Sequence, residues 1–289
     1  MSAVAAIPRR PRRSRRRIAG RVATNLLALF VFVVMLFPVY WMVSTAFKPG
    51  KDILSYTPTW FPVPATLSNF RDAMGRPYFW SDVKNSLIIV GIVVLLSLAL
   101  AFLAALALAK FRFYGRRAFI VLIIGVQMVP LNALIIPLYI LLSRAHQVNK
   151  LSGVILMYLT FVLPFTVWTL RGFMLGVPRE LEEAAMVDGT TRFGAFVRIL
   201  LPLVAPGLVA TSIFAFIQAW NEYLIAYVFL HSPEKQTLTV WLANFTTLRG
   251  TEWGPLMAGA TLTALPVVIF FMLVQRRVAF GLTAGAVRG

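Results

Sequence analysis

Six long apolar stretches constrain this chain more than any other feature of its sequence. They run over about 26–47, 87–109, 118–142, 151–170, 203–230 and 257–274. Each is close to the ~20 residues that a helix needs to cross a ~30 Å hydrocarbon core. Of the 289 residues, 59% are hydrophobic and 13% are charged, which is about half the charged share of a soluble domain. The sequence therefore predicts an all-α membrane protein with six transmembrane helices.

Positive charges are distributed unevenly among the segments that flank these stretches. The segment before the first stretch and those after the second, fourth and sixth hold 8, 4, 4 and 3 Lys and Arg. The alternate segments, 48–84, 144–150 and 231–255, hold 5, 2 and 2. Because segments rich in Lys and Arg stay in the cytoplasm, we expect both termini to be cytoplasmic.

The formal net charge of +18 is compatible with nucleic-acid binding, since eight arginines lie among the first 21 residues. A topology determinant that rests on anionic membrane lipid explains this arm better. The pair Arg9-Arg10 also resembles a twin-arginine export signal, but the following apolar stretch is too long for a signal peptide and no cleavage site follows. We therefore expect an uncleaved first span, contact with lipid, and no nucleic-acid partner.

The segment 171–202 is the only sizeable cytoplasmic insertion predicted between spans. Pro178 suits the first turn of a helix, and the glutamates that follow it favour the positive N-terminal end of the helix dipole. Asp188 and Gly189 indicate the end of that helix, since glycine readily takes the left-handed conformation found there.

A second short helix is expected after this glycine corner. Thr190 or Thr191 can cap it, and Pro202 marks its expected end. The two helices would form a compact projection, and the small side chains of Ala184 and Ala185 would let another protein approach closely.

The same segment carries a specific spacing of residues. Glu183, Ala184 and Ala185 are followed, after three intervening residues, by Gly189 and then by an Ile-x-Leu-Pro sequence that ends at Pro202. This arrangement resembles the cytoplasmic EAA loop of bacterial ABC-importer permeases. An ordinary amphipathic surface loop explains two short helices, but not the joint presence of all three elements between spans four and five.

Three further segments are similar to the same family. The basic turn 110–117 resembles its second cytoplasmic turn, and Trp220-Asn221-Glu222-Tyr223 resembles the signature of its sugar-type members. The tail 281–289 is similar to the short C-terminus of the G-type subunit of maltose and multiple-sugar importers. The chain is thus identified by resemblance as a G-type permease subunit of a carbohydrate ABC importer.

This resemblance implies the type I ABC importer permease fold and a set of partners. Two related permeases form the pore as a heterodimer, a cytoplasmic ATPase dimer accepts the EAA loops, and an extracytoplasmic solute-binding protein delivers the sugar. Glu183 would pair with a basic residue of the ATPase. The residues implied to couple the permease to the ATPase are Glu183, Ala184, Ala185, Asp188, Gly189 and Pro202.

The chain has no P-loop with which to bind ATP, because its only Gly-Lys pair, Gly50-Lys51, is followed by Asp52. ATP hydrolysis is therefore expected from another polypeptide, and this chain is not expected to be an enzyme. His146 and His231 fall outside the apolar stretches, which argues against an intramembrane metal or Ser-His site. We expect neither a metal nor a cofactor.

Polar side chains within spans are costly and usually face a cavity or a partner. Trp220 and Tyr223 could stack on sugar rings, while Asn221 and Glu222 could bond sugar hydroxyls. Alternatively, Asn221 and Glu222 form a structural lock between spans or subunits. The candidates for a substrate path are Gln127, Asn132, Gln218, Trp220, Asn221, Glu222 and Tyr223.

Two functions from different classes remain open at this point. The first is a permease that carries a carbohydrate across the bacterial plasma membrane by alternating access. The second is a secondary transporter or channel that uses Glu222 as an ion or proton site.

The sequence predicts the following division of the chain: a basic cytoplasmic arm at 1–21, the first span at 22–47, a packed aromatic extracytoplasmic loop at 48–85 with a short helix near Asn69, a permease core at 86–278 with the EAA loop at 171–202, and a cytoplasmic tail at 279–289.

Overall fold

The computed structural model describes residues 15–285, with side chains described for 20–275. Residues 1–14 of the predicted basic arm and 286–289 of the predicted tail lie outside the described residues. Nearly all regular structure in it is helical. The elements are α1 (Arg15–Ala46), α2 (Gly50–Ile53), α3 (Ser68–Met74), α4 (Phe79–Lys110), α5 (Arg116–Met128), α6 (Leu131–Arg144), α7 (Leu151–Leu175), α8 (Arg179–Val187), α9 (Arg192–Ala195), the π-helical η1 (Phe196–Leu200), α10 (Leu201–Trp220), α11 (Leu224–Phe229), the 3-10 helix η2 (Pro233–Lys235), α12 (Leu238–Ala243), strands β1 (Thr246–Thr247) and β2 (Gly250–Thr251), and α13 (Trp253–Gly285).

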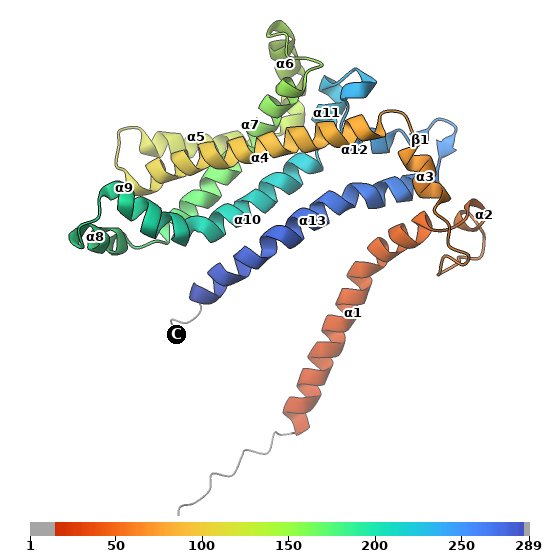
Figure 1. Cartoon of the computed structure of the whole chain (residues 1–289), viewed down its shortest axis with the longest axis horizontal. Helices are drawn as coiled ribbons and strands as arrows, with labels where there is room; N and C mark the ends of the chain where they lie inside the picture. Colours follow the sequence, from red (N-terminus) through yellow and green to blue (C-terminus); the bar gives the residue numbers. More distant parts are fainter. Residues whose placement is uncertain (1–14, 286–289) are drawn as a thin grey trace, which may run out of the picture.

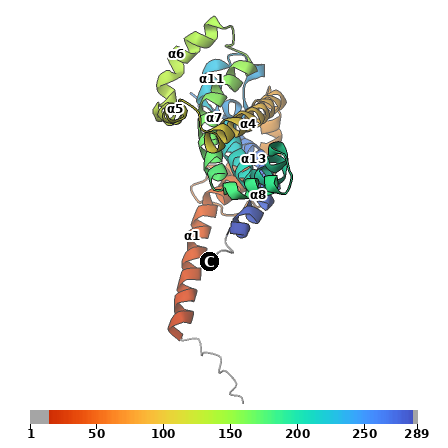
Figure 2. The same ribbon diagram turned by 90° about the vertical axis from the view of Figure 1, so that its left-hand side faces the viewer.

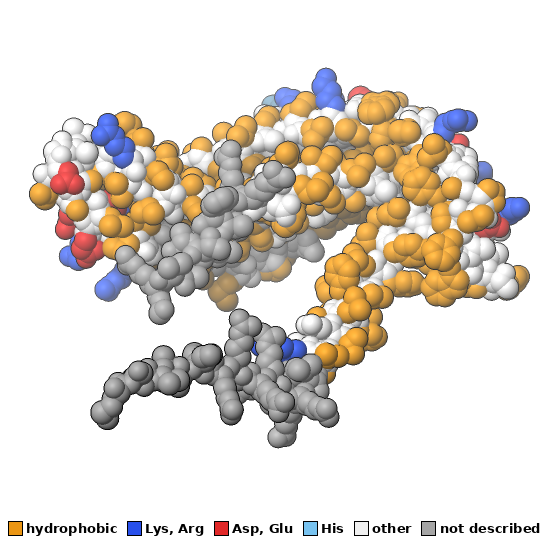
Figure 3. Space-filling view, turned by 60° about the horizontal axis from the view of Figure 1, so that its bottom comes forward, with side chains coloured by type: hydrophobic (Ala, Val, Ile, Leu, Met, Phe, Trp, Pro, Cys, Tyr) orange, Lys and Arg blue, Asp and Glu red, His pale blue; other side chains and the backbone are white. Residues whose placement is uncertain are grey.

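Five helical segments are long and apolar enough to cross a membrane, and α5 with α6 makes a sixth if this bent pair is one span. The five are Gly20–Ala46, Phe79–Lys110, Leu151–Leu175, Arg192–Trp220 and Trp253–Gln275. On the face seen in Figure 3, hydrophobic side chains cover most of the surface between two ends where charged side chains gather. This distribution is that of a protein immersed in a bilayer, and the prediction of an all-α membrane protein is confirmed.

The third predicted span, 118–142, is broken rather than continuous. Helix α5 ends at Met128, α6 begins at Leu131, and the two helices are bent by 101°. The cause is local: Val129 has an extended backbone, φ −80° and ψ 122°, as expected for a residue that precedes proline. Pro130 also lacks the N–H that would continue the helix.

The fifth predicted span, 203–230, is wrong at both ends. It begins earlier, because α9, η1 and α10 form one helical segment from Arg192 to Trp220. It also stops earlier, because Asn221–Tyr223 separate α10 from the short helix α11. The apolar sequence 224–230 therefore forms a separate element, which the hydropathy pattern could not distinguish from more of the same span.

The core is built on the packing of α4 against α7, with α10 against both and α13 against α10. Small residues allow these close approaches. Ala101 and Ala105 of α4 are completely buried. At Gly207 of α10, an added Cβ would lie 2.5 Å from Cγ of Phe173 of α7, so only glycine lets these two helices meet as they do.

Buried side chains form two clusters along the bundle. One lies near the ends of α4 and α7 from which α5 and α8 follow, and it includes Leu108, Leu170, Met174 and Leu200. The larger cluster occupies the other half, where α11 and α12 pack on the helix ends. The first cluster fixes the position of the EAA loop.

The segment between α1 and α4 is packed, as its aromatic content predicts. The rings of Trp41 and Trp60 meet edge to face with centroids 5.8 Å apart. The side-chain amide of Asn69, in α3, donates hydrogen bonds to the carbonyls of Ala46 at 2.9 Å and Lys48 at 2.8 Å. The short helix predicted near Asn69 is thus present, and it ties this segment to the end of α1.

Helix α1 leaves the rest of the bundle along most of its length. It contacts α13 and then diverges from the core toward its N-terminal end in both views (Figures 1 and 2). Its apolar side chains from Val22 to Val39 are largely exposed in this single chain. A helix of this composition is covered by lipid or by another membrane subunit.

Candidate functional site

Helices α8 and α9 form a projection at the end of the bundle where α4 ends (Figure 1). The projection belongs to the EAA loop, residues 171–202. Helix α8 is not part of any helical segment that is long and apolar enough to cross a membrane, whereas α9 begins the segment Arg192–Trp220 that is.

Helix α8 begins and ends as its sequence predicts. Pro178 precedes it with φ −57° and ψ 139°, and Glu180 and Glu182 lie in its first turn. Gly189 follows it with φ +89°, a left-handed conformation that glycine adopts without steric cost. The N–H of Thr190 then donates to the carbonyl of Ala185 at 3.0 Å, which closes the corner.

The second helix of the loop is capped as expected but does not end near Pro202. The N–H of Gly194 donates to Oγ1 of Thr191 at 3.1 Å. The expected end near Pro202 is wrong, because η1 carries the helix into α10. The N–H of Leu201 bonds to the carbonyl of Phe196, five residues back, so the wider π-helical turn absorbs the proline.

The residues implied to couple to an ATPase are accessible. Glu183, Ala184, Asp188, Gly189 and Pro202 are exposed, and Ala185 is half-buried. Large apolar side chains lie beside them: Val187 is 88% exposed and Phe193 is 74% exposed. Exposed apolar side chains next to charged ones, outside the apolar zone, are typical of a surface that binds another protein.

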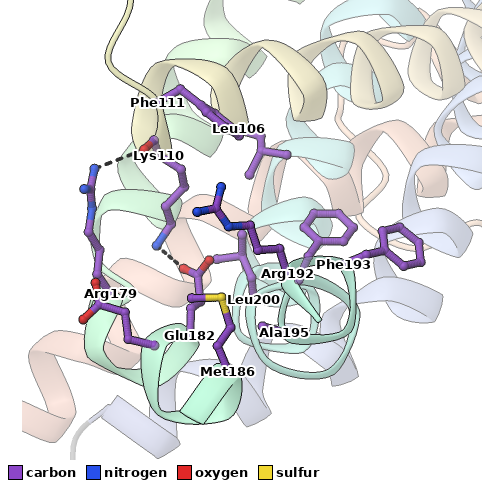
Figure 4. A pocket seen from close by; sticks show the side chains of 12 residues that line it. Leu106, Lys110, Phe111, Arg179, Glu182, Met186, Arg192, Phe193, Ala195 and Leu200 are labelled. Carbon is purple, nitrogen blue, oxygen red and sulfur yellow. Dashed lines mark hydrogen bonds and ion pairs between the residues drawn. The ribbon is translucent and has the colours of Figure 1, made fainter. Parts of the chain in front are cut away.

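The last residue of α4, Lys110, holds the base of α8. Its Nζ lies 2.5 Å from Oε1 of Glu182 and donates to the carbonyl of Val177 at 3.2 Å. The guanidinium of Arg179, in the first turn of α8, also donates a hydrogen bond to the carbonyl of Lys110 at 3.2 Å. Figure 4 shows the contacts of Lys110 with Glu182 and with Arg179, which lie at the start of α8. They join α4 directly to the EAA loop.

An open cavity of about 470 Å³ lies between the end of α4 and the two helices of the loop. Arg192 and Phe193 of α9 line one side, and Leu106 and Phe111 line the side formed by α4 and the turn that follows it (Figure 4). The cavity combines apolar walls with basic and acidic groups, which suits a protein side chain better than a small solute.

Glu222 has a structural role in this conformation. Its carboxylate accepts hydrogen bonds from the N–H groups of Ile225 at 2.9 Å and Ala226 at 3.2 Å, and so caps α11. Its carbonyl accepts from the hydroxyls of Tyr158 at 3.3 Å and Thr239 at 2.9 Å. These contacts support the structural-lock alternative for Glu222 and not a carboxylate free to bind a sugar or an ion.

The expected stacking of Trp220 on a sugar ring does not fit the structure. Trp220 is 4% exposed, and its indole N–H donates to the carbonyl of Thr263 at 3.1 Å. Its ring packs nearly parallel to Phe216, with centroids 5.5 Å apart. Trp220 therefore joins α10 to α13 inside the core, where its apolar ring is buried and its one polar group, the indole N–H, is hydrogen-bonded.

The other predicted path residues lie on the surface of this single chain. Tyr223 is exposed and stacks on Tyr227. Within the described residues, no group of three His, Asp or Glu could hold a metal ion. The remaining exposed path residues are Gln127, Asn132, Gln218 and Asn221.

Residues 97–283 match the family described as binding-protein-dependent transport system inner membrane component. The chain belongs to this family. It is a multi-pass inner-membrane permease subunit of an ABC importer, and ATP is hydrolysed by a separate subunit. The alternative of a secondary transporter or channel is not favoured.

Relatives of this permease match it over almost its whole length. It is 47% identical to the diacetylchitobiose uptake system permease protein DasC of Streptomyces coelicolor, covering 95% of this chain and 100% of the relative. It is 31% identical to the trehalose/maltose transport system permease protein MalG of Thermococcus litoralis, covering 95% and 99%. It is 35% identical to the trehalose transport system permease protein SugB of Mycobacterium tuberculosis, covering 94% and 100%.

A solved structure confirms the fold of the permease. A chain of a bacterial ABC transporter involved in the import of the acidic polysaccharide alginate matches with a TM-score of 0.76 at 24% identity, covering 92% of this chain and 99% of that chain. The permease therefore has the type I importer fold predicted from its EAA loop.

Sequence reasoning missed the contact between Lys110 and Glu182 in the permease. The sequence places Lys110 in a basic turn and Glu182 at the favourable end of a helix dipole. Opposite charges at the ends of two elements were the available signal, but nothing in the sequence brings together residues 72 positions apart. The pairing follows from the packing of α4 on α7.

Proposed function

We propose that this permease forms one half of the translocation path of a carbohydrate ABC importer and that an ATPase drives it through the EAA loop. The observation that carries this proposal is the unbroken helical segment Arg192–Trp220, which begins in the exposed loop and continues as a membrane span. A force on α8 and α9 is thereby applied directly to α10. The ion pair between Lys110 and Glu182 would transmit the same force to α4.

The proposed substrate is a short oligosaccharide or a disaccharide. Support comes from relatives named for diacetylchitobiose, for trehalose and maltose, and for arabinooligosaccharides. These matches cover between 90% and 95% of this chain, so the similarity is not confined to the EAA loop. The exposed polar residues Gln127, Asn132, Gln218 and Asn221, with Tyr223, are the candidates for facing the path.

The proposed assembly contains a second, homologous permease as heterodimer partner, a cytoplasmic ATPase dimer and an extracytoplasmic solute-binding protein. Glu183, Ala184, Ala185, Asp188 and Gly189 would lie in the ATPase interface. Both termini, including the arm at 1–21 and the tail at 279–289, would be cytoplasmic, and the loop 48–85 would face the binding protein. The span at 22–47 would complete the core at 86–278 or reach the second permease.

The proposed mechanism is alternating access. Closure of the ATPase pair would move the EAA loop as one body, because its two helices are fixed at Gly189 and its base is held by Lys110. Helices α4 and α10 would tilt with the loop and change the side from which the path is open. The break at Asn221–Tyr223 lets the outer segment around α11 keep its own packing while α10 tilts.

Deletion and complementation test this function. A strain that lacks the chromosomal copy should lose uptake of one labelled oligosaccharide, with diacetylchitobiose and trehalose tried first, and the wild-type chain should restore uptake. Restoration should require the ATPase gene. Uptake that survives loss of every ATPase gene of this class would reject the proposal in favour of a secondary transporter.

A further inference from the structure

A second cavity lies at the same end of the molecule as the EAA loop but on the other side of the end of α4. It has a volume of about 530 Å³, and it is lined by the turn between α4 and α5, by the start of α5 and by one residue of α7. Four of its lining residues are arginines, namely Arg112, Arg116, Arg117 and Arg171. None of the described residues that line it is acidic.

The positive charge of this cavity is not neutralised by the described part of the chain. The ion pairs among the described residues are Arg76 with Glu252 and Lys110 with Glu182. Neither pair includes one of the four arginines of the cavity. The Nε atoms of Arg116 and Arg171 are buried and have no hydrogen-bond partner among the described groups. A buried guanidinium N–H without an acceptor is costly, which indicates that an acceptor from outside the chain completes the site.

The local structure orients these groups toward an anion. Gly115, with φ +85°, precedes α5, whose 13 residues carry no acidic side chain in the first turn. The positive end of this helix dipole adds to the field of the arginines. Arg171 is held from the other side, since its guanidinium carbon lies 5.4 Å from the ring centroid of Trp168.

The surroundings of the cavity indicate a lipid. Ile120 of α5 lines it, and the exposed side chains of Phe119, Val121 and Leu122 continue along the same helix. The turn that carries the arginines joins two membrane helices, so it lies at the depth of phosphate headgroups. Apolar side chains directly beyond it can accompany acyl chains, which neither a free phosphate nor a soluble acidic protein would need.

We propose that this cavity, the arginine pocket, binds the phosphodiester headgroup of an anionic phospholipid of the cytoplasmic leaflet. Arginine recognises phosphate oxygens through paired N–H donors, and four arginines can engage a headgroup with two phosphates. Basic pockets between membrane helices on the cytoplasmic side bind such headgroups in general. The bound lipid would brace the turn between α4 and α5 against α7, beside the base of the EAA loop.

Native mass spectrometry of the full chain, purified with the subunits that accompany it, tests this proposal. The protein is exchanged into detergent containing phosphatidylcholine with either cardiolipin or phosphatidylglycerol. The wild type should retain an anionic lipid in preference to phosphatidylcholine. The R116Q/R171Q variant should retain it at least about tenfold less, since each basic group near the headgroups contributes measurably to lipid binding.

The matched control is R144Q/R249Q, which removes two exposed arginines elsewhere and leaves retention unchanged. The variant R116K/R171K keeps the charge but removes the paired donors, and it should fall between the wild type and R116Q/R171Q. If R116Q/R171Q does not fold, R112Q/R117Q replaces two exposed members of the same pocket.

Equal retention by the wild type and the pocket variants would overturn the proposal. So would an equal loss in the control pair, because the effect would then be one of net charge alone. Inorganic phosphate that displaces the lipid at equal concentration, or a crosslink from Arg117→Cys to an accompanying protein that excludes lipid, would assign the pocket to a different ligand.

Discussion

Lys110 ends α4, Glu182 lies in the first turn of α8, and their charged groups are 2.5 Å apart. The two side chains are only 11% and 22% exposed, so solvent screens this pair less than an ion pair on the surface. The contact connects a membrane helix with the loop that is proposed to receive the ATPase, and it does so without passing through α9 or α10.

Loss of this pair should weaken the transmission of movement to α4. The substitution Glu182→Gln should lower sugar uptake by about three- to tenfold, corresponding to about 1 kcal/mol of lost interaction, while the amount of protein in the membrane stays the same. Glu180→Gln, which removes an exposed carboxylate from the same turn, is the matched control and should transport normally. The charge-swapped double variant K110E/E182K should recover part of the lost uptake; equal defects in it and in the single variant K110E would remove the pair from the mechanism.

Gly189 should tolerate substitution only at the expense of strain in the corner. An added Cβ would meet nothing within 4 Å, so the effect of Gly189→Ala comes from its φ of +89° and not from a clash. The expected cost is about 1–2 kcal/mol, seen as lower uptake and weaker recovery of the ATPase with unchanged membrane insertion. Gly189→Pro should abolish coupling.

The control for this experiment is Gly172→Ala in α7. That glycine also has open space around it but has no positive φ, so the substitution should be neutral or slightly stabilising. A defect at position 172 as large as the defect at 189 would show that the corner has no special role.

Substitutions of Glu222 distinguish a permease in which this carboxylate caps α11 from a transporter or channel that uses it as an ion or proton site. If its carboxylate caps α11, Glu222→Ala should lower stability in detergent by about 1 kcal/mol, as the loss of a helix cap does. Glu222→Gln keeps one oxygen acceptor, so it should be milder and should still transport. A proton or ion site predicts the opposite order, with transport abolished by Glu222→Gln at normal stability; melting curves and uptake of both variants decide between them.

The contact between α7 and α10 should be intolerant of any added atom at Gly207. Its Cβ would lie 2.5 Å from Phe173, so Gly207→Ala should destabilise the protein by about 1–3 kcal/mol. Trimming the opposing ring in the double variant G207A/F173A should restore part of that loss. Gly125→Ala, where an added Cβ has open space, serves as the control in the same thermal unfolding assay.

The predictable parts of this structure are those that depend on neighbours in the sequence. The start of α8 after Pro178, its end at Gly189 and the cap at Thr191 all follow from the residue itself and a few positions around it. The spans follow from the same kind of information, because hydropathy is summed over adjacent residues.

The parts that escaped prediction depend on where a helix breaks or continues and on tertiary contacts. A carboxylate in an apolar stretch favours a substrate-path role for Glu222, whereas in the structure the chain turns after Trp220 and Glu222 caps α11. The continuation of the helix through Pro202 depends on a π-helical turn, and hydropathy does not report it. Trp220 follows the same pattern, since its burial depends on α13, whose sequence lies far downstream.

A separate ATPase is proposed to move this permease through the EAA loop, and crosslinking tests this contact directly. The chain contains no cysteine, so Ala184→Cys introduces a unique thiol at an exposed position of α8. Leu248→Cys, in the loop between β1 and β2 at the opposite end of the molecule, is the control and is 109% exposed. With a short thiol crosslinker in native membranes, position 184 should give a covalent product with the ATPase whose yield changes on ATP binding, and position 248 should give none. Absence of an ATPase product from position 184, under conditions where the same thiol reacts with a small maleimide, would contradict this proposal.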